Sequence, residues 1–112
     1  AGKLDGLAMR VPVPDGSVVD LVTIMSQNVT VEQVREAVRD YVNTDRLRPI
    51  LRYSTDALVS SDIVGDPHSS IFDSEYTSVI GGNMLKTLSW YDNEWGYSNR
   101  VVDLLDRMDS LG

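Results

Sequence analysis

The sequence predicts an α+β fold with a mixed, mostly antiparallel sheet, a crossover helix and a C-terminal helix. Three observations predict this fold class: five short apolar runs patterned as strands, a helical repeat after a capping signal, and a second helical repeat near the C-terminal end. The 112 residues correspond to one domain or to part of one.

The first two strands are expected at residues 7–13 and 17–25. Apolar side chains in residues 7–13 alternate onto one face, but Pro12 and Pro14 lack amide donors, so this strand should lie at a sheet edge or end there. Asp15-Gly16 is a strong turn signal between the two strands. Residues 17–25 are almost continuously apolar, which is typical of a strand covered on both faces.

A crossover helix is expected over residues 31–43. Thr30 and Gln33 form a capping-box pattern at its start, and apolar positions then recur with helical spacing. A polar connection leads to a short strand at residues 50–53. Residues 56–73 are expected to be irregular, because their serines and aspartates favour local turns over long strand ladders.

A β-hairpin and a helix complete the predicted fold. Residues 77–80 and 84–91 read as strands joined by a tight turn at Gly81-Gly82-Asn83. The last helix has apolar residues at helical spacing around residues 101–108, and Asp92 or Asn93 is its expected N-cap. The sequence therefore predicts five strands and two helices.

Composition excludes several classes of protein. Ten basic and 17 acidic residues give a net charge of −7, without the basic stripe of a nucleic-acid binder or of a protein that binds anionic membranes. The chain has no cysteine and one histidine, so we expect no disulfide, no cysteine nucleophile and no metal site. No apolar run is long enough for a membrane span, and the first residues do not resemble a signal peptide. These features favour a cytoplasmic protein.

Two features could bind a ligand. Arg10 carries a fork of donors that suits phosphate or carboxylate; the alternative is a solvated or salt-bridged arginine. Residues 90–97 place four aromatic side chains beside Asn93 at a strand-to-helix junction, where a carboxamide could match a ligand carboxamide. The alternative there is a helix cap with aromatic packing. Gly96, one turn into the helix, indicates that another element or a ligand approaches the backbone.

A third feature, residues 66–70, contains Asp, His and Ser within five positions. Neighbours in one loop cannot align a nucleophile, a base and an orienting acid, because the members of a catalytic triad meet from distant parts of a fold. We therefore expect His68 to make local hydrogen bonds. From the residues alone, the sequence indicates an acidic α+β domain that could bind a small anion.

Four segments carry a family resemblance. SWYDNEWGYSNR (residues 89–100), AMRVPVP (8–14), VSSD (59–62) and DPHSSIFD (66–73) resemble, in order and spacing, the phosphorylating glyceraldehyde-3-phosphate dehydrogenases. The resemblance covers residues 1–112 and matches the C-terminal portion of the family's catalytic domain. It implies that the Rossmann domain, the catalytic cysteine and the catalytic histidine belong to a preceding part of the parent enzyme.

The resemblance also implies an activity. The parent would convert glyceraldehyde 3-phosphate and inorganic phosphate to 1,3-bisphosphoglycerate in glycolysis, through a cysteine thioester and with NAD (or NADP) as hydride acceptor. The cofactor would be bound mainly by the Rossmann domain. The resemblance further implies a homo-oligomer, a tetramer in the parent, and a chain that is inactive without the missing N-terminal part.

The family's site residues carry over at three positions. Arg10 matches the arginine that binds the substrate and attacking phosphates, Asn93 matches the residue that hydrogen-bonds the nicotinamide carboxamide, and Tyr97 matches a tyrosine near the nicotinamide pocket. No catalytic residue and no metal ligand is expected in this chain. The competing hypothesis is a non-catalytic interaction or oligomerisation module derived from the same domain, since several apolar rows would lack partners in such a piece.

Overall fold

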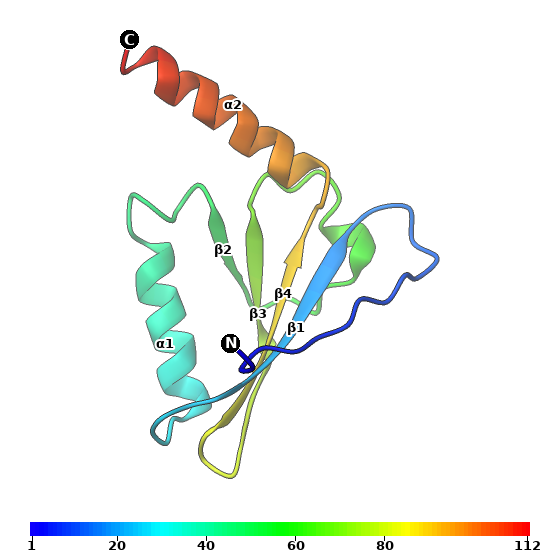
Figure 1. The fold of residues 1–112 in the computed structure, drawn as a ribbon, viewed down its shortest axis with the longest axis vertical. Coiled ribbons are helices and arrows are strands. Elements are labelled where there is room, and N and C mark those ends of the chain that lie inside the picture. Colours follow the sequence, from blue (N-terminus) through cyan, green and yellow to red (C-terminus); the bar gives the residue numbers. More distant parts are fainter.

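The computed structural model describes residues 1–112 and contains one four-stranded mixed sheet and two α-helices (Figure 1). The strands lie in the order β1-β4-β3-β2, with β1–β4 and β4–β3 antiparallel and β3–β2 parallel. Their bounds are β1 Ser17–Ile24, β2 Leu51–Ser54, β3 Ser70–Ile80 and β4 Met84–Tyr91. The predicted fold class, α+β with a mixed and mostly antiparallel sheet, is confirmed.

Helix α1 (Val31–Val42) connects β1 and β2, which are the two edges of the sheet, and it lies beside β2 (Figure 1). Thr30 Oγ1 accepts a hydrogen bond from the Gln33 amide, and the Gln33 side chain accepts one from the Thr30 amide, so the predicted capping box is present. The Arg35 guanidinium donates to the Ser74 carbonyl oxygen at 2.7 Å and attaches the helix to β3. The predicted crossover helix is thus confirmed.

The hydrophobic core is small and lies where the loop after β2 meets the sheet. Leu58, Ile63 and Ile71 are buried together, and Trp90 packs against them. A short 3₁₀ turn, η1 (Ser60–Asp62), carries the chain between Leu58 and Ile63. The loop therefore lies against the sheet beside the ends of β3 and β4.

Helix α2 (Trp95–Asp109) projects beyond the end of the sheet from the last residues of β4 (Figure 1). All side chains from Val101 onward are exposed, including the apolar residues of the predicted helical face. Neither helix has the length and apolar run needed to cross a bilayer.

Three predictions about strands were wrong. Residues 7–13 form no strand: their apolar side chains are exposed, and Pro12 and Pro14 cannot donate to a ladder. β1 is not covered on both faces, because it is an edge strand whose apolar side chains are 44–67% exposed. β3 begins at Ser70, inside the segment that was predicted to be irregular.

The polar start of β3 is explained by side-chain hydrogen bonds. Asp73 is fully buried and accepts hydrogen bonds from the Trp90 indole at 3.0 Å and from the Glu75 amide at 3.1 Å. The register of β3 and β4 shifts after Asp73, so the carboxylate satisfies amides that a regular ladder would have paired. These polar residues look like turn formers in sequence but stabilise a bulged strand.

Candidate functional site

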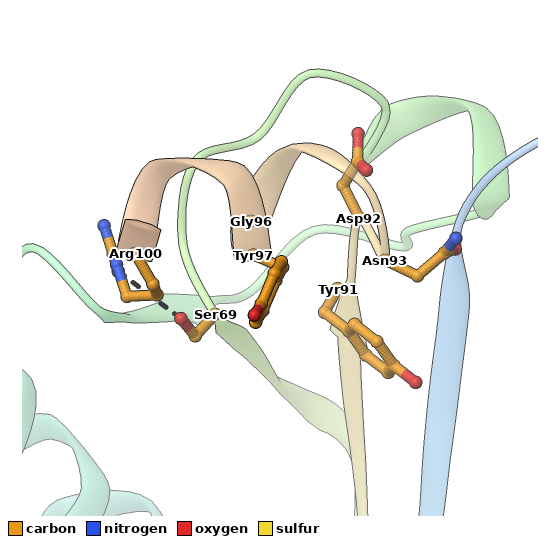
Figure 2. A pocket seen from close by; sticks show the side chains of 7 residues that line it. All are labelled: Ser69, Tyr91, Asp92, Asn93, Gly96, Tyr97 and Arg100. Atoms are coloured by element: carbon orange, nitrogen blue, oxygen red, sulfur yellow. Dashed lines mark hydrogen bonds between the residues drawn. The ribbon is translucent and has the colours of Figure 1, made fainter. Parts of the chain in front are cut away.

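A pocket of about 330 Å³ lies at the junction of β4 and α2 (Figure 2). Its lining comes from the end of β4, the β4–α2 connection, the first turns of α2 and the loop before β3: Ser69, Tyr91, Asp92, Asn93, Gly96, Tyr97 and Arg100. The structure therefore brings together two of the three predicted site residues, Asn93 and Tyr97.

Asp92 shapes this junction. Its carboxylate is 2% exposed and accepts three backbone hydrogen bonds: from Gly65 at 2.8 Å, Glu94 at 2.9 Å and Trp95 at 2.7 Å. Burial by itself raises the pKa of Asp92, but these amide donors outweigh it and lower the pKa below its usual value. The helix cap was predicted at Asp92 or Asn93; Glu94 occupies the cap position, and Asp92 satisfies the first amides of α2.

Gly96 allows α2 to approach the loop before β3. A Cβ atom at this position would lie 3.0 Å from the His68 carbonyl oxygen, which is closer than ordinary packing allows. The expectation that another element approaches the backbone at Gly96 is therefore confirmed. Ser69, the next residue of that loop, lines the pocket together with Gly96.

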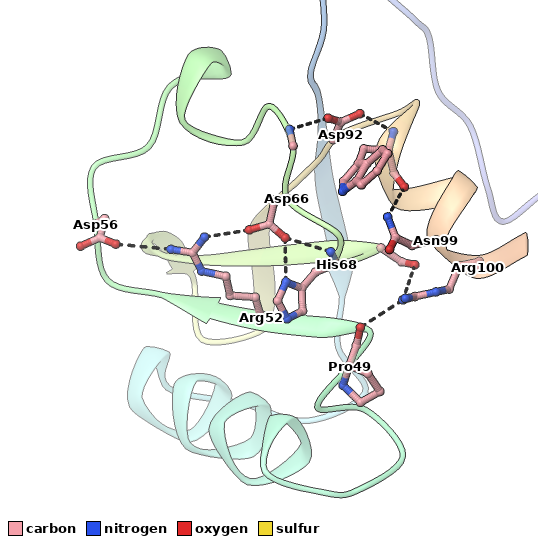
Figure 3. Close-up of polar contacts among 11 residues, drawn as sticks. Pro49, Arg52, Asp56, Asp66, His68, Asp92, Asn99 and Arg100 are labelled. Atoms are coloured by element: carbon pink, nitrogen blue, oxygen red, sulfur yellow. Dashed lines mark hydrogen bonds and ion pairs between the residues drawn. The ribbon is translucent and has the colours of Figure 1, made fainter. Parts of the chain in front are cut away.

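The Asp66 carboxylate holds the loop before β3 through its hydrogen bonds and ion pair (Figure 3). Asp66 Oδ1 lies 2.6 Å from His68 Nδ1 and accepts from the His68 amide, while Asp66 Oδ2 lies 2.8 Å from the Arg52 guanidinium. Burial by itself raises the pKa of Asp66, but the His68 and Arg52 donors outweigh it and lower the pKa. The predicted local hydrogen bonds of His68 are confirmed, and the histidine is bonded to Asp66 and not to a serine.

Arg100 closes the pocket on the side away from Asn93 and was not predicted as a site residue. Its guanidinium donates to the Pro49 carbonyl oxygen at 3.1 Å and to Ser69 Oγ at 3.4 Å (Figures 2 and 3). Its position four residues after Gly96 places both on one helix face, which is the sequence signal that could have identified it. Both bonds come from Nη1, and through them Arg100 braces α2 against the loop.

Asn93 lines the pocket and has an unpaired amide donor. Asn93 Oδ1 accepts a hydrogen bond from Ser17 Oγ at 3.1 Å, and no protein atom accepts from Nδ2. The carboxamide thus offers an amide donor and one unused acceptor lone pair, a set that matches a nicotinamide carboxamide. The Tyr97 side chain, 73% exposed, lines the same pocket beside Tyr91 (Figure 2).

Arg10 lies outside this pocket. It belongs to the exposed N-terminal segment before β1, and its guanidinium makes neither a hydrogen bond nor an ion pair. The structure places no group of three acidic or histidine side chains where they could hold a metal ion. The chain's own residues therefore provide a pocket lined by the Asn93 carboxamide and, outside it, the unpaired guanidinium of Arg10.

Comparisons with known proteins agree with the resemblance found in the sequence. Residues 1–93 match the model of the glyceraldehyde 3-phosphate dehydrogenase C-terminal domain. Glyceraldehyde-3-phosphate dehydrogenases of Streptomyces coelicolor and Mycobacterium leprae are each 56% identical to the chain, over 92% and 93% of its length. The chain spans about a third of these relatives, 31% and 30% of their lengths. It therefore belongs to the family of glyceraldehyde-3-phosphate dehydrogenase C-terminal domains.

Proposed function

We propose that residues 1–112 act as the C-terminal portion of the catalytic domain of a glycolytic dehydrogenase. The complete enzyme would convert glyceraldehyde 3-phosphate and inorganic phosphate to 1,3-bisphosphoglycerate through a cysteine thioester. The hydride acceptor would be NAD (or NADP), bound mainly by a Rossmann domain in another part of the enzyme. The observation that carries this proposal is the unpaired Nδ2 of Asn93 at the pocket of a chain whose relatives are such dehydrogenases.

In this proposal Asn93 orients the nicotinamide ring. Nδ2, which has no acceptor within the chain, would donate to the carboxamide of the ring, and the second lone pair of Oδ1 would be available to accept from it. Tyr97 closes the pocket beside the ring. Holding the carboxamide on one side fixes which face of the ring receives hydride.

Arg10 has a different role in the proposal. Its guanidinium is exposed and has no carboxylate partner, so its donors are available for the phosphate of the substrate and the attacking phosphate. In the proposal, the part of the enzyme that carries the cysteine supplies the rest of this phosphate site. In this proposal Arg10 binds phosphate and Asn93 binds the cofactor of the same reaction.

A chimaera tests this proposal. In it, residues 1–112 replace the matching third of the Streptomyces coelicolor relative, which supplies the remaining two thirds. We expect phosphate-dependent reduction of NAD by the chimaera and none by residues 1–112 alone, because the chain contains no cysteine nucleophile. An inactive but folded chimaera, or turnover by the isolated chain, would contradict the proposal.

Two substitutions in the chimaera test the residue roles. Arg10→Ala should raise the KM for inorganic phosphate by about 10-fold or more, since a charge-assisted contact contributes about 1.5–3 kcal/mol. Asn93→Ala should weaken NAD binding by about 10-fold and leave the KM for phosphate unchanged. If Arg10→Ala changed NAD binding and Asn93→Ala changed the KM for phosphate, both roles would be refuted.

A second candidate function, an interaction or oligomerisation module without catalysis, is supported by the exposed apolar surface of β1. Val18, Leu21 and Ile24 are 44–67% exposed on an edge strand, and exposed apolar surface of this kind favours association. Sedimentation of the chain discriminates between the candidates: a self-associating chain that also yields an inactive chimaera supports the module.

For the dehydrogenase we propose a homo-tetramer in the cytoplasm, with no nucleic-acid or membrane partner.

A further inference from the structure

We propose that Ser17 is a positioning residue that holds the Asn93 carboxamide at the pocket in the conformation that binds nicotinamide. This inference rests on the proposed function, in which Asn93 contacts the ring. It adds a residue from a different strand, 76 positions away in the sequence, to the cofactor site.

The sheet places Ser17 beside Asn93. Ser17 is the first residue of β1 and pairs with Tyr91, the last residue of β4, so the β1–β4 ladder ends two residues before Asn93. Ser17 Oγ then reaches across the strand ends and donates to Asn93 Oδ1 at 3.1 Å. Figure 2 shows the Asn93 side chain directed toward the end of β1.

The backbone and the side chain of Asn93 are held by different groups. Asp92 holds the backbone that follows Asn93 through the Glu94 and Trp95 amides, and it is itself tied to the Gly65 amide. It makes no bond to the Asn93 side chain, which is exposed and free to change rotamer apart from its bond to Ser17. Ser17 is therefore the one group of the chain that restricts the carboxamide.

The remaining bonding capacity of Asn93 makes this restriction useful. With Oδ1 bound to Ser17, both protons of Nδ2 and one lone pair of Oδ1 remain for a ligand. Ordering a free side chain on binding weakens affinity, and a side chain that is already ordered avoids this cost. Loss of the hydroxyl should therefore weaken NAD binding by roughly 3-fold to 10-fold.

The test measures nucleotide affinity by calorimetry in the chimaera. The variants are Ser17→Ala, Ser17→Thr, which keeps a hydroxyl, Asn93→Ala and the double substitution. The two probes are NAD and ADP-ribose, which has no nicotinamide ring. We expect Ser17→Ala to weaken NAD binding and leave ADP-ribose binding unchanged, Ser17→Thr to retain most of the NAD affinity, and Ser17→Ala to have no further effect when Asn93 is already alanine.

The other outcomes separate this inference from the proposed function. Unchanged NAD affinity in Ser17→Ala, with a loss in Asn93→Ala, would overturn the role of Ser17 and leave that of Asn93 intact. An equal loss of ADP-ribose affinity in Ser17→Ala would also overturn it, since a disturbed fold explains that result. Unchanged NAD affinity in Asn93→Ala would overturn the cofactor role of Asn93 and, with it, the inference.

Discussion

Removal of the Asp92 carboxylate should destabilise the chain strongly. Three backbone amides donate to this group at 2.7–2.9 Å, and hydrogen bonds to charged groups contribute about 1.5–3 kcal/mol each. Gly65, Glu94 and Trp95 are exposed residues, so water would satisfy part of what Asp92→Ala leaves unpaired. We therefore expect a loss of about 3 kcal/mol, well below the full value of three bonds.

The isosteric variant Asp92→Asn sharpens this prediction. Asp92 Oδ2 accepts from the Gly65 amide, and Oδ1 accepts from the Glu94 and Trp95 amides. Both oxygens are acceptors, so the side-chain NH2 group of the introduced asparagine would face a backbone N–H on one side and lose that hydrogen bond. The expected loss is about 2 kcal/mol.

Urea unfolding followed by tryptophan fluorescence measures the effect. Both tryptophans lie in the region concerned: the backbone amide of Trp95 donates to Asp92, and the side chain of Trp90 packs against the hydrophobic core. Asp109→Asn is the matched control, since Asp109 is exposed and its side chain has no partner. If Asp92→Asn lowered the free energy of unfolding by no more than this control, the account of the β4–α2 junction would be wrong.

Three further predictions concern the surroundings of this junction. Gly96→Ala should lower the melting temperature, because the added Cβ would lie 3.0 Å from the His68 carbonyl oxygen. The helix propensity of alanine, which is about 1 kcal/mol better than that of glycine, acts in the opposite direction, so a higher melting temperature would contradict this packing. The lowered pKa of Asp66 contributes stability that is present above the unfolded-state pKa of about 4 and is lost as pH falls through the folded-state pKa. Asp66→Asn should therefore flatten the stability profile below about pH 4, and an unchanged profile would refute the contribution. Lys86→Ala should change stability by less than about 0.5 kcal/mol, because its pair with Asp20 is exposed; urea unfolding checks this, and a loss above 1 kcal/mol would contradict it.

The sequence was most informative where local chemistry decides structure. The Thr30 capping box and the Gly81-Gly82 turn gave α1 and the hairpin correctly, because both signals act within a few residues. The start of β3 could not be predicted from the sequence. The buried Asp73 carboxylate finds its hydrogen-bond donors at Trp90 and at a register shift, and both arise only in the folded sheet. The exposure of β1 likewise depends on which surfaces meet in three dimensions.

The same distinction applies to the candidate site. Asn93 and Tyr97 lie about one helical turn apart, so a helix that begins between them brings both to one pocket. Ser17 could not be assigned to that pocket from the sequence, since its contact with Asn93 requires the register of β1 on β4. Arg10 shares no pocket with these residues, and its role rests on the family alone.

The most direct test of the central claim observes Asn93 itself. In the chimaera, the side-chain amide resonances of Asn93, assigned by comparison with Asn93→Ala, are recorded with NAD and with ADP-ribose. A hydrogen bond from Nδ2 to the nicotinamide carboxamide predicts a downfield shift of an Nδ2 proton with NAD and no such shift with ADP-ribose. Identical Asn93 resonances with both nucleotides, at saturating concentrations, would contradict the claim that this chain binds the nicotinamide ring.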